Sequence, residues 1–456
     1  MAMGKRSNRE RQADLWIPSD RIVEPPGHVF YTKLDALLTA HHFDRAVEHL
    51  CQRFYRGPLG QPSLPPGVYF RCLLIGFFEG LDSERGIAWR VADSLSLRKF
   101  LGYGVDERTP DHSTISRTRR LLWASTHQAV FRWVLRRVQA EGLLAGTCVG
   151  IDATTLEANA AMRSIVRRDT GATYEAYLRT LAEAAGIIEP TRDELRRFDR
   201  TRKQKGSNRD WVSPADPDAR ITKMKDGRTH LAHKAEHAVD LSSGALMAIT
   251  LHAADQGDTT TGMTTLRAAD RATLALEVGP VAEAVLDKGY HSGAVLVALA
   301  EMGVRSYVPE ATRKTRRRWT GKGKHDEQRQ VYANRRRVRG PRNRGLQAKR
   351  AELNERSNAH LYETGGMRRV HLRGRENILK RLLIHGAGFN LALIMRTRYG
   401  RGTPRGLQGC PVSSSGQRRC AARTGAANTT RTSGSAATRH RISRRSVPVF
   451  YRPIIT

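Results

Sequence analysis

The spacing of apolar residues changes at about residue 144, and this change divides the chain into two kinds of structure. Before it, segments such as VFYTKLDALLTAHHFDRAVEHL and HQAVFRWVLRRVQAEGLL carry apolar residues every three or four positions, which predicts helices. After it, short apolar runs such as GTCVGID alternate with helical segments, which is typical of an α/β sheet. We therefore expect an all-α N-terminal domain at residues 29–143 and an α/β domain at residues 144–400.

The α/β part has a definite order of predicted elements. A strand at residues 146–152 is followed by two antiparallel strands at residues 229–240 and 245–255, joined by the turn LSSG. Helices at residues 259–277 and 293–304 alternate with strands at residues 281–287 and 305–310, and an amphipathic helix at residues 375–396 is expected to pack on the sheet. The predicted fold is a mixed sheet with flanking helices and a polar insertion at residues 163–219. A polar arm at residues 1–28 precedes it, and a disordered basic tail at residues 401–456 follows.

The formal net charge of +34 on 456 residues is the strongest compositional signal. Such an excess repels itself, so a polyanionic partner is its natural explanation, and nucleic acid is the commonest one. Residues 313–350 alone hold sixteen Lys or Arg and two acids, Asp326 and Glu327, which predicts a phosphate-contacting segment. A translation-machinery or chromatin-like protein that only neutralises phosphate is the alternative that composition leaves open.

Cysteine usage and the lack of apolar runs indicate where such a chain works. The five cysteines have no CxxC spacing, which argues against a zinc ribbon and against a disulfide framework. No run approaches about 18 apolar residues and the N-terminus has no apolar signal core, so no membrane span is expected. No GxxxxGK[ST] loop occurs, so no nucleotide cofactor is expected either. We predict a cytoplasmic protein associated with the nucleoid.

Two aspartates follow apolar runs in the α/β part. Asp152 ends the first predicted strand, and Asp287 ends the strand VAEAVLD. Taken singly, each is more often a helix or turn cap. Adjacent strand ends lie on one rim of an open sheet, so the pair can converge, and a hard divalent cation such as Mg²⁺ relieves the repulsion between two close carboxylates. Two such ions about 4 Å apart support phosphodiester displacement, which usually requires a third acid from a neighbouring helix. The candidates for that acid are Glu352, Glu355, Glu363 and Glu376.

Short helices joined by tight turns in the N-terminal part are compatible with a helix-turn-helix module. The segment STISRTRR at residues 113–120 is polar and basic. If it contacts DNA, the expected contacts are Ser116, Arg117 and Arg119. A helical bundle without DNA contact gives the same pattern, so both interpretations stay open.

Several separated blocks of the sequence resemble bacterial insertion-sequence DDE transposases. They are VGIDATTLEANAA, LDKGYHS and ERSNAHLYETGGMRRVHLRGRENILKRLLIHGAGFN, with further likeness in TPDHSTISRTRRLL and in residues 218–261. The resemblance runs from about residue 22 to residue 409. It implies a ribonuclease-H-like catalytic domain whose metal ligands would be Asp152, Asp287 and Glu355. Glu363 is the reserve for the third position, because Asn358 stands where the family often has an aromatic residue. The resemblance treats Asp255 and Asp258 as structural.

The resemblance also implies partners and a reaction. Basic residues of the last block would contact DNA phosphates near the cut: Arg356, Arg368, Arg369, Arg373 and Lys380. The expected activity is binding of element ends, hydrolysis that frees a 3′-OH, and attack of that hydroxyl on target DNA, with two Mg²⁺ ions and Mn²⁺ as an alternative metal. Two ends must be cut together, so a homodimer on double-stranded DNA is expected. The alternatives are a catalytically inactive DNA-binding relic and a ribonuclease-H-like nuclease that cuts without joining.

Overall fold

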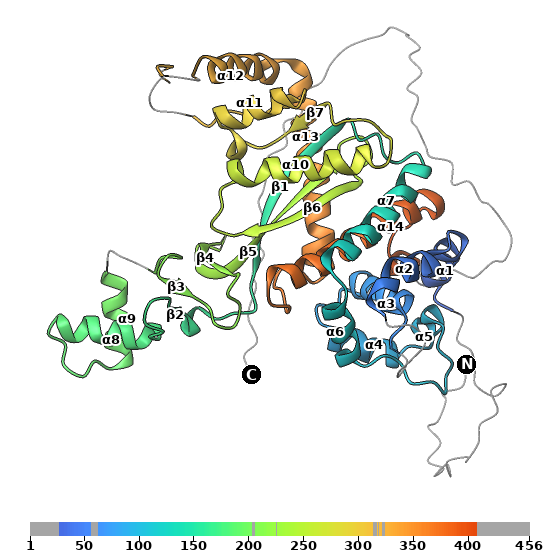
Figure 1. The fold of residues 1–456 in the computed structure, drawn as a ribbon, viewed down its shortest axis with the longest axis horizontal. Coiled ribbons are helices and arrows are strands. Elements are labelled where there is room, and N and C mark those ends of the chain that lie inside the picture. The colour runs from blue at the N-terminus through green and yellow to red at the C-terminus, as the bar shows by residue number, and fades with distance from the viewer. Residues whose placement is uncertain are drawn as a thin grey trace, which may run out of the picture. The chain divides into compact units, whose positions relative to one another are not determined.

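The helices predicted for the N-terminal part are present. The computed structural model describes residues 27–55, 63–202, 206–224, 226–312, 317, 319–321 and 324–407, and almost all of the predicted polar arm and tail lie outside these ranges. Ser83, Ser94 and Asp111 accept hydrogen bonds from backbone N–H groups at three helix starts, which is the usual role of such residues at an N-cap. The helices, called the helical region below, are α1 (Val29–Ala40), α2 (Phe43–Cys51), α3 (Pro66–Phe78), α4 (Glu84–Ala92), α5 (Leu95–Leu101), α6 (His112–Leu121) and α7 (Ala124–Ala140) (Figure 1).

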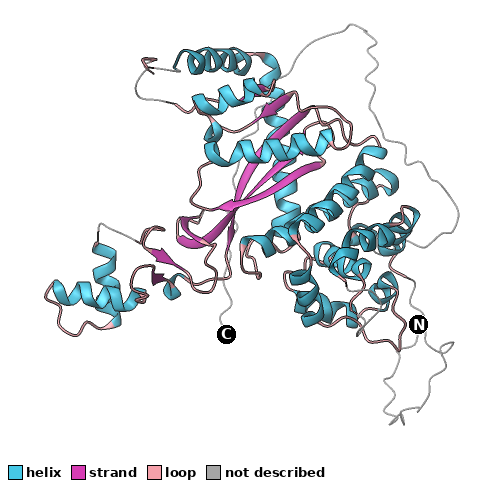
Figure 2. Cartoon of the chain, viewed as in Figure 1, coloured by secondary structure: helices cyan, strands magenta, loops and turns pink. Residues whose placement is uncertain are grey.

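The sheet combines antiparallel and parallel strands. β1 (Cys148–Glu157) pairs antiparallel with β5 (Thr229–Asp240), and β5 pairs antiparallel with β6 (Leu246–Ala253) and with the short β4 (Arg220–Lys223). On its other side β1 pairs parallel with β7 (Glu283–Val285), which pairs parallel with β8 (Arg305–Tyr307). This order confirms the predicted mixed sheet with flanking helices (Figure 2). The helices of this sheet region are α10 (Asp258–Leu274), α11 (Gly293–Glu301), α12 (Lys324–Arg339), α13 (Pro341–Asn358) and α14 (Arg375–Tyr399).

Different helices cover the two faces of the sheet. Arg350 of α13 forms an ion pair with Asp152, so α13 lies on the face to which Asp152 points. Thr261 of α10 hydrogen-bonds to Glu236, which pairs with Ala153, so α10 lies on the opposite face. Neighbouring residues of a strand point to opposite faces, and Asp152 and Ala153 therefore mark the two sides.

α14 links the helical region to the sheet, since it contacts α3, α7 and β6. Most of its residues are buried, including the polar residues Lys380, Arg381, His385 and Asn390. Arg375–Gly406 is long and apolar enough to cross a membrane by length and composition, but 89% of its apolar window is buried inside the structure. The predicted packing of this helix on the sheet is confirmed. Its predicted amphipathic character is wrong, because protein surrounds nearly all of it and it is a core helix.

The insertion between β1 and β5 has a small core of its own. It contains a ribbon of β2 (Val166–Arg167) and β3 (Trp211–Val212) and the helices α8 (Tyr174–Ala184) and α9 (Arg192–Thr201). Tyr174 and Tyr177 pack edge-on against Trp211. A capping box of Thr191 and Glu194 begins α9. The polar insertion predicted at residues 163–219 is thus folded into helices and a short ribbon in its described residues.

Candidate active site

Asp152 lies inside β1. The prediction that the strand ends at this residue is wrong, because β1 pairs with β5 from Val149↔Asp240 as far as Glu157↔Ala232. The Asp152 side chain is 27% exposed, and its Oδ1 lies 3.7 Å from Nη1 of Arg350 on α13. The carboxylate therefore reaches solvent beside a cation, on the face of the sheet that α13 covers.

Asp287 follows the neighbouring strand β7, which ends at Val285, two residues earlier than the sequence predicted. β1 and β7 run parallel, and their last paired residues are Gly150 and Val285. Asp152 lies two residues after Gly150, and Asp287 lies two residues after Val285. The carboxylate of Asp287 caps the short turn Lys288–Tyr290 and accepts a hydrogen bond from the N–H of Gly289 at 2.7 Å. The register thus places both aspartates that the sequence singled out two residues beyond this parallel pairing.

The phenol of Tyr290 lies near both aspartates. Tyr290 is buried, and burial is the main cause that raises its pKa well above the ordinary value. The negative charges of four carboxylates raise this pKa further, and they belong to Glu236, Asp258, Asp152 and Asp287. Two of these carboxylates already have a cation, since Nζ of Lys234 lies 2.6 Å from Oδ1 of Asp258 and 3.2 Å from Oε1 of Glu236. A Cβ on Gly289 would lie 2.5 Å from Oδ2 of Asp258 and 3.0 Å from Oδ1 of Asp287, so these two carboxylates border the same glycine.

Glu355, the predicted third acid, lies on α13 and is exposed. Its neighbour Asn354 is buried over Gly150 of β1. Within the described part of the chain, both polar atoms of the Asn354 side chain lack a hydrogen-bond partner. An unpaired buried amide costs about 1–3 kcal/mol, so it calls for a water or an ion as partner. This amide is compatible with a hydrated cation at the Asp152 face.

Glu363, the reserve for the third acid, lies in the π-helical turn Ala359–Thr364 and is also exposed. It forms an ion pair with Arg368. Arg368 donates a further hydrogen bond to Oγ1 of Thr154 at 3.1 Å. Thr154 follows Asp152 by two positions on the same face of β1. Glu355 and Glu363 therefore both belong to the segment that packs against this face.

The donors at this site fit a hard divalent cation. Carboxylate oxygens are the ligands that Mg²⁺ prefers, and Mg²⁺ keeps several waters, so one or two protein carboxylates commonly hold it. Asp152 and Asp287 each follow the last paired residues of β1 and β7, Gly150 and Val285, by two positions and are the candidate pair. Among the residues described by the structure, no group of three or more His, Cys, Asp or Glu is arranged to hold a metal. The arrangement thus suits a cation held by two carboxylates and completed by water or substrate oxygens.

Two of the predicted DNA contacts are buried and paired inside the protein. Arg119 on α6 is 8% exposed, and its guanidinium donates to both carboxylate oxygens of Glu84, at 2.6 and 3.3 Å. Lys380 on α14 is 4% exposed, and its Nζ lies 2.9 Å from Oε1 of Glu376. A cation buried in this way is not accessible to phosphate. The DNA contact predicted for Arg119 and Lys380 is therefore inconsistent with their positions.

Other predicted contacts lie at or near the surface. Ser116 is half-buried and accepts a hydrogen bond from Arg119 at 3.0 Å. Arg356 forms an ion pair with Glu352, one turn earlier on α13, at 2.5 Å. The exposed members of the predicted set are Arg117, Arg369 and Arg373.

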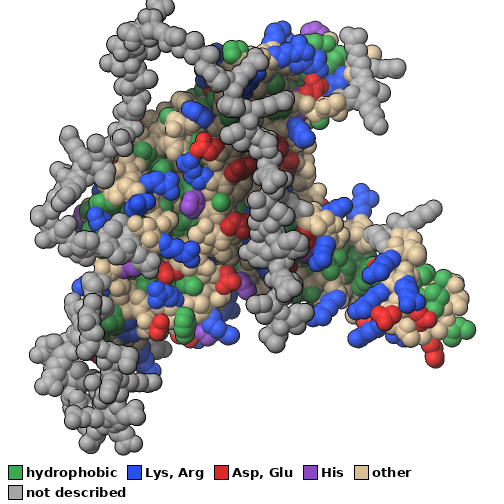
Figure 3. Space-filling model, turned by 180° about the vertical axis from the view of Figure 1, so that it is seen from behind, with side chains coloured by type: hydrophobic (Ala, Val, Ile, Leu, Met, Phe, Trp, Pro, Cys, Tyr) green, Lys and Arg blue, Asp and Glu red, His purple; other side chains and the backbone are tan. Residues whose placement is uncertain are grey.

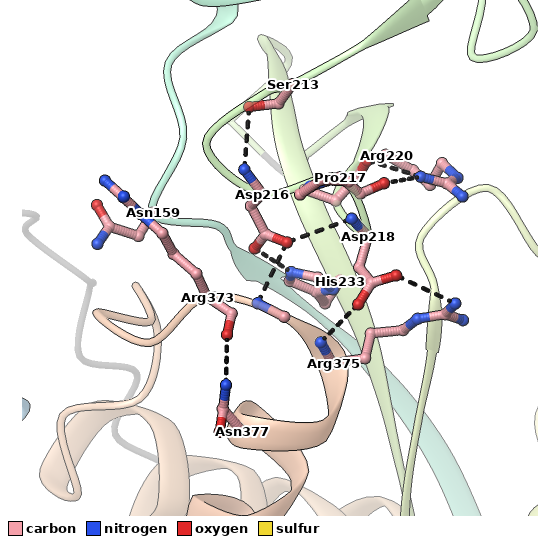
Figure 4. A network of polar contacts seen from close by, with 12 residues as sticks. Asn159, Ser213, Asp216, Pro217, Asp218, Arg220, His233, Arg373, Arg375 and Asn377 are labelled. Carbon is pink, nitrogen blue, oxygen red and sulfur yellow. Dashed lines mark hydrogen bonds and ion pairs between the residues drawn. The ribbon is translucent and has the colours of Figure 1, made fainter. Parts of the chain in front are cut away.

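Arg373 lies just before α14, whose start is held by two carboxylates (Figure 4). Asp216 is buried and accepts a hydrogen bond from Nε2 of His233 at 3.0 Å. Asp218 accepts a hydrogen bond from the backbone N–H of Arg375 at 3.0 Å. Negative charge near a helix N-terminus is favourable, because the helix dipole is positive there. In Figure 4 the side chain of Arg373 extends away from these two carboxylates, so the network anchors α14 and leaves this guanidinium exposed.

Basic side chains also gather on other parts of the surface. Within the described residues of the predicted phosphate-contacting segment, 324–339 form α12 and 341–350 form the first part of α13. Figure 3 shows Lys and Arg side chains over this segment and over the insertion. Exposed cations of the two regions include Arg336, Arg339, Arg344, Lys349, Arg197 and Arg200. Their distribution suits contact with an extended polyanion.

The sequence did not single out four residues that surround the two aspartates, namely Glu236, His237, Tyr290 and Tyr362. The one available signal lies in the strand LAHKAEHAVD, where Lys, Glu and His occur in a run that is buried at every position from 231 to 240. Polar residues in a strand buried on both faces require partners. Which partners they find depends on segments distant in the sequence.

Family models match two separate stretches of the chain, and residues 122–196, which include Asp152, lie outside both. Residues 19–121 match the family described as a transposase domain, and residues 197–445 match the family described as Transposase DDE domain. The second match includes Asp287, Glu355 and Glu363 and continues beyond the described residues. No curated protein and no solved structure matches the chain.

Proposed function

The chain belongs to the family of insertion-sequence DDE transposases, since the DDE match covers more than half of its 456 residues, and we propose that it cleaves and joins DNA in a metal-dependent reaction. The observation that supports this proposal is the parallel pairing of β1 and β7 as far as Gly150↔Val285, two residues before Asp152 and Asp287. We propose further that the sheet is a ribonuclease-H-like catalytic fold. The order β5-β1-β7-β8, with β6 beside β5, supports this assignment.

In this proposal Asp152 and Asp287 hold the metal, and Glu355 is the third ligand with Glu363 in reserve. A pair of Mg²⁺ ions, or Mn²⁺ in their place, would supply activation of the attacking oxygen and stabilisation of the leaving oxygen. The protein's own part is positioning and charge neutralisation, as in other phosphoryl transfers. Arg350, 3.7 Å from Asp152, places a cation where a scissile phosphate would approach.

Double-stranded DNA is the proposed partner, both as element ends and as target. The net charge of +34 supports this. The contacts that we retain from the predicted set are Ser116, Arg117, Arg356, Arg368, Arg369 and Arg373. Hydrolysis at an element end frees a 3′-OH, and this hydroxyl then attacks a target phosphate. Two ends must be cut together, so we propose a homodimer on DNA that works at the nucleoid.

A labelled duplex that carries the terminal repeats of the flanking element tests this proposal. The wild-type protein is expected to cleave and join the duplex with Mg²⁺ and to do neither with EDTA. Asp152→Ala and Asp287→Ala should lose both steps by roughly 10³-fold and still bind the duplex, because charge stabilisation by the site is lost. Asp255→Ala is the matched control, since this aspartate is 38% exposed and lies 3.9 Å from Arg220.

The same assay identifies the third acid and the alternatives. Glu355→Gln and Glu363→Gln run side by side, and the variant that loses cleavage marks the ligand. Cleavage without joining would make the protein a nuclease, and tight binding without cleavage would make it a DNA-binding relic. Full activity of Asp152→Ala would contradict the mechanism.

A further inference from the structure

Glu236 and His237 are neighbours in β5 and point to opposite faces of the sheet. In the β1–β5 register Glu236 pairs with Ala153, and His237 pairs with Asp152. Their side chains are buried, with 0% and 1% of each residue exposed. Buried polar groups require partners. Each of these two finds a tyrosine hydroxyl, and each tyrosine comes from a segment that carries a proposed metal ligand.

On the α10 face, Glu236 holds the turn that carries Asp287. Tyr290 donates a hydrogen bond to Oε1 of Glu236 at 3.2 Å, and Nζ of Lys234 lies 3.2 Å from the same oxygen. The Tyr290 ring packs against Gly262 of α10, where a Cβ would lie 2.5 Å from the ring. Asp287 caps the turn to which Tyr290 belongs. The position of the phenol therefore fixes the position of the Asp287 carboxylate.

On the α13 face, His237 holds the helix that carries Glu355. Ser357 donates its hydroxyl proton to the carbonyl oxygen of Asn354 at 3.0 Å, so its Oγ accepts from Nδ1–H of His237 at 3.3 Å. Nε2 of His237 then accepts a hydrogen bond from the hydroxyl of Tyr362. Burial lowers the pKa of His237 to about 3, so the imidazole is neutral, as this order of bonds requires. The chain of hydrogen bonds ends on α13 one residue before Glu355.

We propose that Tyr290 and Tyr362 are positioning residues whose hydroxyl groups fix Asp287 and the Glu355 helix against β5, and thereby set how tightly the site binds metal. This inference rests on the proposed function of Asp152 and Asp287 as ligands. Neither tyrosine touches metal or substrate in this role. Mutation of a residue that orients a metal ligand without touching the metal typically weakens metal affinity by about 10- to 100-fold, because ligand geometry determines binding.

The helical region supplies matched control residues. Tyr31 donates a hydrogen bond to Oε1 of Glu79 at 2.6 Å, and the Tyr69 hydroxyl pairs with Nε2 of His127 at 2.9 Å. Both tyrosines are buried. The sheet region has one tyrosine–glutamate pair and one tyrosine–histidine pair, and these two tyrosines of α1 and α3 form the same kinds of pair. Neither control pair involves a proposed metal ligand. Removing either hydroxyl there costs stability without touching the metal site.

The experiment measures Mn²⁺ affinity of the full-length protein by electron paramagnetic resonance, together with Tm. Tyr290→Phe and Tyr362→Phe are compared with the controls Tyr31→Phe and Tyr69→Phe. We expect Mn²⁺ binding to weaken by about tenfold or more in the first two and to stay at the wild-type level in the controls, with similar falls in Tm. The Mg²⁺ concentration that half-saturates DNA cleavage should rise in the same two variants, with Kd for DNA unchanged.

Wild-type Mn²⁺ affinity in folded Tyr290→Phe and Tyr362→Phe proteins would overturn the inference, as would an equal loss in the controls. If Tyr362→Phe does not fold, Ser357→Ala interrupts the same chain of hydrogen bonds at its other end and is expected to weaken Mn²⁺ binding in the same way. Failure of the proposed function gives a different result, because the wild type would then bind Mn²⁺ no better than Asp152→Asn.

Discussion

The helical region and the sheet region bury the same kinds of polar pair in different surroundings. In the helical region Tyr69 meets His127, and the pair joins α3 to α7 within an apolar core. In the sheet region Tyr362 meets His237, and the pair joins the segment after α13 to β5, directly beside Asp152. The bond chemistry is the same in both. What differs is the segment that the bond holds, so the function of a buried polar pair has to be inferred from its neighbours.

The two regions also differ in the surroundings of their carboxylates. Arg71 of α3 lies 2.7 Å from Asp35 and 2.8 Å from Asp44, so a single arginine pairs both acids. Asp152 lies 3.7 Å from Arg350 and shares its surroundings with Glu236, Asp258 and Asp287. Lys234 pairs Glu236 and Asp258, at 3.2 and 2.6 Å, so the proposed metal ligands of this group are Asp152 and Asp287 alone. We therefore assign the paired acids of the helical region to stability, and among the acids near Tyr290 we propose metal binding only for Asp152 and Asp287.

The largest predicted effect is a fall in the free energy of unfolding at acid pH. A buried histidine in each region causes it. Burial is the main cause that lowers the pKa of His127 from 6.5 to about 4, and that of His237 to about 3. As the pH falls, the histidine takes up a proton in the unfolded chain at a higher pH than in the folded protein. The contribution of each neutral histidine to the free energy of unfolding is therefore complete above pH 6.5. It is lost as the pH falls from 6.5 toward the folded-state pKa. For His127 this amounts to about 3 kcal/mol.

Urea unfolding between pH 7 and pH 4 measures this effect. The dependence of the unfolding free energy on pH should become shallower in His127→Asn and in His237→Asn. Only the second variant is expected to lower Mn²⁺ affinity at pH 7. An unchanged pH dependence in both variants would show that these histidines are not held neutral by burial.

The next effect concerns the two arginines that face carboxylates. Arg71→Met leaves Asp35 and Asp44 without their partner and should lower the free energy of unfolding by about 2–3 kcal/mol, with cleavage activity kept. Arg350→Met should reduce DNA cleavage and lower the unfolding free energy by less than about 1 kcal/mol, because its pairing with Asp152 is loose. Urea unfolding and the cleavage assay compare the two. Equal destabilisation by both changes would remove the distinction between the regions.

The smallest predicted effect concerns the salt dependence of DNA binding and distinguishes Arg117 from Arg119, both on α6. Arg117 is exposed on α6, and Arg117→Ala should reduce the slope of log Kd for DNA against log salt concentration by about 1, with stability nearly unchanged. Arg119→Ala leaves Glu84 unpaired and should lower Tm without changing that slope. Fluorescence anisotropy over a range of salt concentrations measures both. A change of slope in Arg119→Ala that matches the change in Arg117→Ala would contradict its assignment to the interior.

The order of sheet elements was predictable because its signals are local. The hairpin of β5 and β6 flanks the turn LSSG, and the helices around β7 have a clear apolar period. The length of β1 was not predictable, because Thr154 and Thr155 do not mark a strand by themselves and become one by pairing with β5. The local pattern therefore predicted which helices and strands form. Their lengths depend on pairing between segments that are distant in the sequence.

Most side-chain contacts could not be predicted from the sequence. Asp152 and Asp287 could be found, since a lone carboxylate after an apolar run is a local signal. Charged residues of a helix are usually exposed, so nothing in the sequence indicated that Arg119 is buried. Its partner Glu84 lies 35 residues away, and the partner of Tyr362 lies 125 residues away. Contacts across such separations depend on tertiary packing.

The most direct test of the account locates the metal itself. Crystals of the protein bound to its terminal-repeat DNA, grown with Mn²⁺, would reveal each bound ion by anomalous scattering. The account predicts a peak in coordination contact with carboxylate oxygens of both Asp152 and Asp287. Ions bound elsewhere on the protein, with these two carboxylates uncoordinated, would contradict its central claim.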